Sequence, residues 1–567
     1  MSPMSEDLAD SMSRLRLDDS FLYSPNFAAK LLKMFKNDPN LASLLSSEKV
    51  KPPKTPQSRA RNHETAAPRL VPIQRLPPGL LADIFKEYLK DPMSFLAQEE
   101  CPFSFMHRPS KNLLYFVRPF VLILSQVCSS WRRVVHGTSS LWTSLELKVY
   151  KRFPDRKVFG DWIRRSGSLP LTFKMEFVGA KQETVPDTYF DSLADACTRW
   201  QVIELEIFHH YYEPLLRRKD LRFPLLESIR FGGFFIPYEE RSFQLLKHAP
   251  RLTRLEISPI IAKRGGELSA YVKDVIPILS QITYLRLNGV SGDPDDYLTI
   301  LRSCDNLEFC AFSLPDYPDR RRRSGSRTIV ELPHLHTLGI EFSCDEGAPE
   351  FFDSLKLPRL KKLGVIHEFV PTDERDLFEQ LEMLENRHSP IFHLIQLQQR
   401  SQFELDYLTF RTITSMTSSE LLRFLKVVPG VGDLRIQDCM LDMQELCHGL
   451  LAGKDKQVVL LPKLEALTIA QTHVMDGVME LRDELMSESE SEGGISVFDV
   501  VCSRWDPWRY GRANEWKDSW DFTRLERLYI TKQIIDKQPI GEWVRLEGLD
   551  RRGFEVNILE SFGPGSF

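Results

Sequence analysis

Cysteine is scarce in this sequence, and its spacing excludes two kinds of small scaffold. The chain has 567 residues but only nine cysteines, and no two of them form a Cys-x-x-Cys pair. An odd number of scattered cysteines supports neither a disulfide framework nor a zinc ribbon. We therefore expect reduced thiols and a cytoplasmic or nuclear location.

Long apolar runs and familiar catalytic motifs are also missing. The densest apolar run, residues 120–124, is far shorter than the roughly 20 residues that span a bilayer. The first residues do not show the basic segment followed by an apolar run that a secretory signal has. The sequence contains no G-x-S-x-G, H-E-x-x-H or P-loop motif, and the pair His209 and His210 has no further ligand at metal-binding spacing. We expect a protein outside the membrane, without catalytic residues, cofactor or metal.

Charge of either sign is not in excess. The 74 Lys and Arg residues nearly balance the 79 Asp and Glu residues, which leaves a net charge of -5. This balance argues against binding of nucleic acid through bulk charge. With 42% hydrophobic residues the chain can form packed cores, and its length predicts several domains or a repeat array.

Three segments differ in composition from the rest. Residues 1–70 lack Cys and Trp and include a proline-rich linker at 51–58, which predicts a disordered tail. Within this tail, residues 27–35 form either a partner-binding helix or a transient one. The run Arg320–Arg323 is either a phosphate-binding or nuclear-targeting element or a solvated loop. Four of the nine tryptophans lie between Trp505 and Trp520, as either an aromatic clamp or a capping insert.

From about residue 200 the chain repeats a short pattern, apolar-x-x-apolar-x-apolar. The middle positions of the first copies advance by 24 to 30 residues, and later copies are more widely spaced; these positions are 205, 229, 255, 285, 310, 338, 363, 408, 434, 467 and 528. Such a period is typical of leucine-rich repeats, in which each copy supplies one short strand and neighbours stack into a continuous core. The asparagine that usually follows the strand is missing, and of the corresponding positions only Cys439 fits. We expect an irregular α/β solenoid over residues 151–562.

Side chains beside the inward apolar pair of each copy should point to the concave face of such a solenoid. The central copies place arginine and aromatic residues there, which are common anchors of protein interfaces. We expect a protein substrate to contact this face at Arg254, Glu256, Tyr284, Arg286 and Phe309.

Residues 71–150 predict a small helical module. Leu76 opens this segment, and apolar residues recur at helical spacing from Leu80 to Leu89 and again over 120–135, with a polar insert at about 90–115 between them. A Leu141-Trp142 pair then leads into a strand.

These segments together resemble the F-box of fungal F-box-like proteins that carry leucine-rich repeats. The resemblance implies an all-α F-box that binds a Skp-type adaptor and, through it, the cullin of a ubiquitin ligase. The positions carried over as adaptor contacts are Leu76, Pro77, Leu80, Leu81, Ile84, Phe85, Val127, Cys128 and Trp131. The implied function is non-catalytic recruitment of a substrate; the alternative is a repeat scaffold that never engages a ligase.

Overall fold

In the computed structural model the chain divides into two compact units, Met1–Leu226 and Glu227–Phe567. The structure describes residues 76–90, 120–149, 156–177, 188–207, 218, 220–232, 244–257, 276–287, 294–314, 328–342, 351–367, 389–452, 459–471, 495–505, 523–531, 534 and 554–559. The predicted tail, residues 91–115 of the insert, His209 and His210, the Arg320–Arg323 run and the tryptophan-rich segment after Trp505 lie outside these residues.

The predicted helical module lies in unit 1. Helix α5 spans Pro78–Lys90, and a proline is tolerated at this first position because its missing N–H has no partner within a helix. Helices α7 and α8 span Phe120–Val127 and Ser129–Gly137, and the 3₁₀ turn η3 spans Ser139–Trp142. Phe85 and Trp131 are buried and their ring centroids lie 4.7 Å apart, so the two apolar stripes meet in one core.

The apolar segment 120–135 is two helices, not the single helical segment that its periodicity indicates. Cys128 separates them with an extended backbone (φ -162°), and its sulfur accepts a hydrogen bond from the backbone N–H of Trp131 at 3.5 Å. The thiol therefore takes the place of an N-cap side chain, and Cys128 is half-buried rather than part of a continuous apolar stripe.

The rest of unit 1 alternates strands with helices. Its elements are β1 (Ser144–Val149), α9 (Arg156–Arg165), β2 (Leu171–Phe177), α10 (Thr188–Asp195), the 3₁₀ turn η4 (Cys197–Arg199) and β3 (Trp200–Glu206). Strand β2 pairs in parallel with β1 and with β3. Trp142 of η3 packs edge-on against Trp162 of α9 at 4.8 Å, so the helical module and the first strand–helix turn share a core.

Unit 2 contains a longer series of parallel strands. They follow in the order β4 (Ser228–Gly232), β5 (Arg254–Ile257), β6 (Tyr284–Leu287), β7 (Phe309–Leu314), β9 (Thr337–Phe342), β11 (Lys362–His367), β12 (Tyr407–Arg411), β13 (Asp433–Gln437), β14 (Ala466–Ala470), β15 (Arg527–Thr531) and β16 (Glu555–Leu559). A separate parallel pair is formed by β8 (Val330–Glu331) and β10 (Leu355–Lys356).

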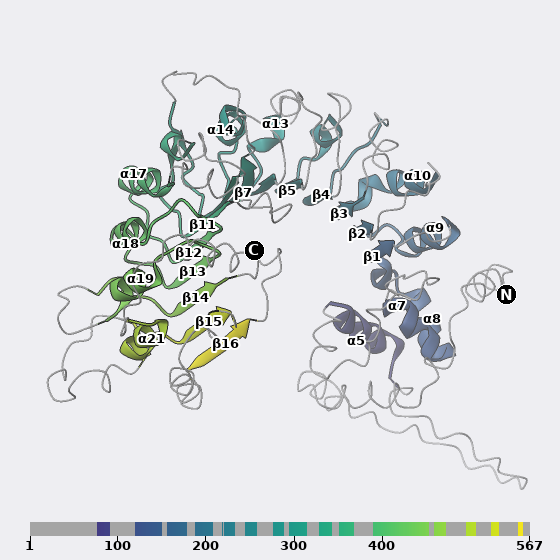
Figure 1. The fold of residues 1–567 in the computed structure, drawn as a ribbon. Helices are drawn as coiled ribbons and strands as arrows, with labels where there is room; N and C mark the ends of the chain where they lie inside the picture. Colours follow the sequence, from purple (N-terminus) through teal and green to yellow (C-terminus); the bar gives the residue numbers. More distant parts are fainter. Residues whose placement is uncertain are drawn as a thin grey trace, which may run out of the picture. The chain divides into compact units, whose positions relative to one another are not determined.

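Helices and 3₁₀ turns connect these strands. They are η6 (Gln244–His248), α13 (Ile276–Leu279), α14 (Pro294–Arg302), η7 (Phe352–Ser354), α17 (Ile391–Ser401), α18 (Ser418–Val427), α19 (Met443–Leu450) and α21 (Val497–Trp505). Within unit 2, α14, α17, α18, α19 and α21 lie on the same side of the row of strands (Figure 1). In the described part of the chain, no helix has the length and apolarity needed to cross a membrane.

The middle residue of every repeat copy lies on one of these parallel strands. Leu255 pairs with Leu285, Leu285 with Cys310 and Cys310 with Leu338, and all four side chains are buried. The predicted strands at Leu255, Leu285 and Leu338 are therefore confirmed. The long parallel sheet with its helices is consistent with a solenoid-like α/β arrangement.

A backbone ladder sets the register at the start of successive strands. The carbonyl of Glu227 accepts from the N–H groups of both Thr253 and Arg254, at 2.9 and 3.0 Å, and the carbonyl of Thr253 accepts in the same way from Thr283 and Tyr284. The same double acceptance recurs along the unit as far as the Glu465 carbonyl. Because these bonds need no particular side chain, the copies can align without the asparagine that the repeat usually has.

Candidate functional site

Side chains of the unit 2 strands alternate between two faces. In β5 and β6, Leu255 and Leu285 are buried in the core, whereas the preceding Arg254 is exposed and Tyr284 is half-buried. Because successive side chains of a strand point to opposite faces, these residues lie on the side away from the core. We call this side of the unit 2 sheet the inner face.

The structure brings together the five residues that the sequence predicts for substrate binding. Strand register places Arg254, Tyr284 and Phe309 side by side across β5, β6 and β7, and it places Glu256 beside Arg286 one step further along. Their contact with a substrate remains a prediction, but their convergence on one patch is a property of the fold.

A fourth charged residue near this patch, Arg230 of β4, did not appear in the sequence prediction. It lies beside Glu256 in the strand register. Its position was readable in principle, since it falls between the two last apolar residues of its copy, Ile229 and Phe231, as Glu256 falls between those of the next copy. We call Arg230, Arg254, Glu256 and Arg286 the arginine cluster.

Glu256 lies at the centre of the arginine cluster and is only 4% exposed. Its carboxylate oxygens lie within ion-pair distance of three guanidinium groups, at 3.4 Å from Arg230 Nε, 3.7 Å from an Nη atom of Arg254 and 3.5 Å from an Nη atom of Arg286. These distances exceed the roughly 2.7–2.9 Å of a charge-assisted hydrogen bond. One carboxylate thus has three guanidinium groups near it, and its contacts with Arg254 and Arg286 are both longer than such a bond.

Two aromatic rings extend the patch. The rings of Tyr284 and Phe309 are stacked, with centroids 4.0 Å apart and planes 4° apart, and the guanidinium of Arg254 lies 3.6 Å from the centroid of Tyr284. Such a cation–π contact restrains the guanidinium while leaving its charge in place. Burial raises the pKa of the Tyr284 hydroxyl, which therefore stays protonated near neutral pH and adds no negative charge.

A further arginine of the inner face, Arg435 of β13, is neutralised by its neighbour. It donates to both carboxylate oxygens of Asp433, at 3.2 and 3.1 Å, and its guanidinium lies 5.0 Å from the ring centroid of Tyr407. This bidentate pair leaves no net charge, unlike the arginine cluster.

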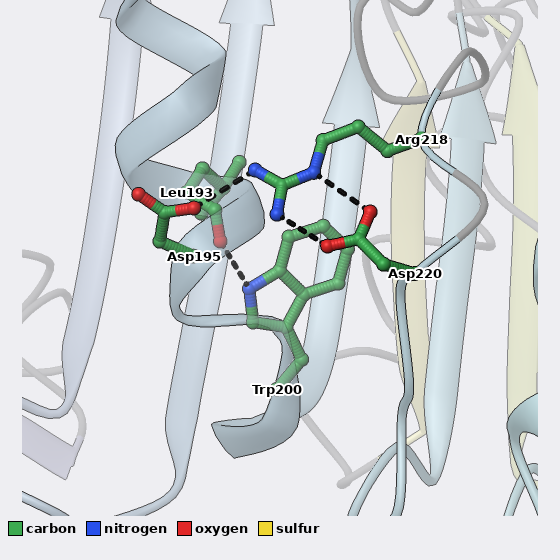
Figure 2. A network of polar contacts seen from close by, with 5 residues as sticks. All are labelled: Leu193, Asp195, Trp200, Arg218 and Asp220. Atoms are coloured by element: carbon green, nitrogen blue, oxygen red, sulfur yellow. Dashed lines mark hydrogen bonds and ion pairs between the residues drawn. The ribbon is translucent and has the colours of Figure 1, made fainter.

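At Arg218 of unit 1, carboxylates outnumber guanidinium groups. Its guanidinium donates to Asp195 at 2.8 Å and to both oxygens of Asp220 at 3.1 and 2.7 Å, while the indole N–H of Trp200 donates to the Leu193 carbonyl (Figure 2). The hydrogen bond from Arg218 lowers the pKa of the Asp220 carboxyl. Two carboxylates surround one arginine here, so this network is saturated and serves to hold neighbouring segments of unit 1.

The predicted adaptor contacts in the helical module differ in exposure. Leu81, Ile84, Phe85 and Trp131 are buried, so in this chain they fill the core of the module. Pro77 is exposed, Val127 is 40% exposed, and Leu76, Leu80 and Cys128 are half-buried. The second group offers a partner more surface than the first, and contact with an adaptor remains a prediction for all nine.

Two buried thiols of unit 2 are poorly suited to act as nucleophiles. Burial raises the pKa of the Cys304 and Cys447 thiols to about 12, so neither provides a thiolate nucleophile near neutral pH. Within the described residues, no group of three or more His, Cys, Asp or Glu side chains could hold a metal ion.

Comparison with known proteins identifies the helical module. No curated protein matches the chain. A family model described as F-box-like matches residues 73–148, the segment that contains α5, α7, α8 and η3. F-box domains bind Skp-type adaptors and generally belong to non-catalytic adaptor subunits of ubiquitin ligases. The F-box part of the resemblance is therefore confirmed, and residues 73–148 form an F-box-like domain.

Proposed function

We propose that this protein is the substrate-recruiting F-box subunit of a Skp-cullin-F-box ubiquitin ligase. The observation that carries the proposal is the F-box-like match at residues 73–148. In this role the protein performs no chemistry itself. It binds a Skp-type adaptor through the F-box-like domain, reaches the cullin through that adaptor, and holds a protein substrate on the inner face of unit 2.

The exposures in the F-box-like domain support a division of labour among the predicted contact residues. Pro77, Leu80 and Val127 offer apolar surface to the adaptor, whereas Phe85 and Trp131 keep the helices in place from within the core. Partly exposed apolar side chains on a small module are suited to a protein interface. The seven described cysteines are free thiols, which fits a cytoplasmic or nuclear location.

Adaptor binding by the full chain tests this proposal. We expect a purified Skp-type adaptor to bind the wild-type chain, and Val127→Glu to weaken binding about tenfold or more, because the change places a charge in an apolar contact. Isothermal titration calorimetry would measure both affinities. Val127 is exposed at the end of α7, so this variant should fold.

Arg133→Gln is the matched control, since Arg133 is an exposed polar residue of α8 in the same domain. It should bind the adaptor as the wild-type chain does. A wild-type chain that does not bind the adaptor at micromolar concentrations would contradict the proposal and favour the alternative, a repeat scaffold that acts outside a ligase.

A further inference from the structure

The arginine cluster on the inner face carries an excess of positive charge that the rest of the chain does not share. Arg254 and Arg286 share the single carboxylate of Glu256, which leaves a net charge of +1 on these three side chains, whereas the whole chain has a net charge of -5. The excess is local and partly shielded from solvent, since the side chain of Arg286 is 20% exposed and that of Arg230 is 34% exposed. Charges in such a setting interact with an incoming anion more strongly than fully solvated ones do.

The cluster also has donor capacity that its own carboxylate does not use. The Nε atom of Arg286 is buried and has no hydrogen-bond partner among the described residues. This enclosed donor leaves the Arg286 charge less well compensated, but a partner would have to bind the outer Nη atoms of the guanidinium. The ion pairs of Arg254 and Arg286 with Glu256 are long, at 3.7 and 3.5 Å, so both guanidinium groups can accept a further anionic partner.

The aromatic stack gives the patch an apolar part beside its charges. Tyr284 lies between the guanidinium of Arg254 and the ring of Phe309, and both rings are half-buried. Stacking keeps Arg254 in place before any partner arrives, which lowers the entropic cost of binding. The patch therefore combines prearranged guanidinium groups with an accessible aromatic surface.

We infer that the inner face at Arg230, Arg254, Tyr284, Arg286 and Phe309 binds an acidic segment of a partner protein, in which aspartate or glutamate carboxylates flank an apolar side chain. This inference rests on the proposed function, because it names the chemical class of substrate that the site would recruit. The carboxylates bind the guanidinium groups around Glu256, and the apolar side chain packs on the Tyr284–Phe309 stack.

An acidic polypeptide fits this patch better than a nucleic acid does. Nucleic-acid binding normally uses a track of several cations along a phosphate backbone. The row of side chains in register with Arg286 does not continue such a track, since the next strands place Ala311, Gly339 and Gly364 there. A short site with two incompletely paired arginines and a hydrophobic side suits a few carboxylates and one apolar residue.

Fluorescence anisotropy with defined peptides and the full chain tests the inference. The probe is a fluorescein-labelled nonapeptide, Glu-Glu-Gly-Glu-Phe-Glu-Gly-Glu-Glu, and its control has glutamine in place of every glutamate. We expect the acidic peptide to bind about tenfold or more tightly than the control. Arg286→Gln and Arg254→Gln should each weaken its binding several-fold, and added salt should weaken it further.

Two further variants separate this site from general charge effects and from misfolding. Glu256→Gln preserves the shape of the side chain and raises the local charge, so it should tighten binding of the acidic peptide. Arg435→Gln removes the same charge as Arg286→Gln from the corresponding position of another strand and should leave the affinity unchanged. Thermal unfolding of each variant would identify any that does not fold.

Three results would overturn the inference: equal binding of the acidic and glutamine peptides, equal losses in Arg435→Gln and Arg286→Gln, or tighter binding of a 20-nucleotide oligothymidylate that depends on the same arginines. The assay contains no adaptor, and Arg286→Gln should bind the adaptor as the wild-type chain does. A failure of adaptor binding and a failure of peptide binding are therefore separate observations.

Discussion

Three arginines stabilise the connections between strands by donating to backbone carbonyls. One of them, Arg504 of α21, is fully buried, and burial lowers its pKa to about 10, so it remains charged near neutral pH. The carbonyl partners are those of Ile163, Gly167 and Leu169 for Arg199, Phe352 and Leu355 for Arg400, and Leu450, Leu460 and Leu461 for Arg504. These side chains satisfy carbonyls at the ends of helices and in the segments that join the strands.

The sequence could not reveal this role of arginine. Arg504 bonds to carbonyls 54 and 43 residues earlier in the chain, so no local pattern connects donor and acceptor. Cys439 does lie at the position of the expected asparagine, and its sulfur lies 3.3 Å from the Gln437 carbonyl. One thiol cannot replace a row of asparagine side chains. The three arginines instead supply hydrogen-bond donors to the backbone carbonyls.

Removal of the Arg504 guanidinium should destabilise unit 2. Arg504→Met preserves much of the side-chain volume but leaves buried carbonyls without a donor, and we expect the free energy of unfolding to fall by about 2–4 kcal/mol. Urea denaturation followed by tryptophan fluorescence would measure this loss.

Arg423→Met provides the matched control, because Arg423 is exposed on α18. Its effect should stay within about 0.5 kcal/mol. If Arg504→Met were as stable as the wild-type chain, its hydrogen bonds would not contribute to stability as we describe.

At the scale of elements, the first helix of the F-box-like domain begins with an unfavourable residue. Gly79 is exposed in the first turn of α5, which contains no acidic residue, and a Cβ atom added there would meet nothing within 4 Å. Glycine weakens a helix through its conformational freedom, and a negative charge near the N-terminus stabilises one.

Gly79→Glu should therefore raise the free energy of unfolding of unit 1 by about 1 kcal/mol. Differential scanning calorimetry of the full chain would detect the shift of the corresponding transition. Gly79→Gln is the control for propensity alone and should show a smaller gain. A glutamate variant no more stable than the wild-type chain would show that the helix start does not limit stability.

The elements also show which features could be predicted from the sequence. The unit 2 strands were predictable, because their apolar pattern is local and recurs at a nearly constant spacing, as at Leu255, Leu285 and Leu338. The break at Cys128 was not, because an apolar helical period continues through a residue that caps the second helix. The packing of Trp142 on Trp162 depends on tertiary structure, so the sequence did not indicate that the F-box-like domain and the following strands share a core.

At the scale of the whole molecule, the candidate substrate site was only partly predictable. Alternation along the strands was enough to select Arg254, Tyr284 and Phe309 for one face. The excess charge around Glu256 depends on which strands lie side by side, so the contribution of Arg230 became apparent only from the register. Alternation within one strand can be read from the sequence, whereas the register between strands, which brings Arg230 beside Glu256, cannot.

Sedimentation velocity can show whether one chain joins a ligase adaptor to an acidic protein segment. The full chain, a Skp-type adaptor and the labelled acidic nonapeptide are mixed, and the sedimentation of the fluorescent label is followed. We predict that the peptide sediments with a complex of chain and adaptor. Val127→Glu should remove the adaptor from that complex, and Arg286→Gln should release the peptide. A peptide that never sediments with the adaptor, or that the adaptor displaces, would contradict the account.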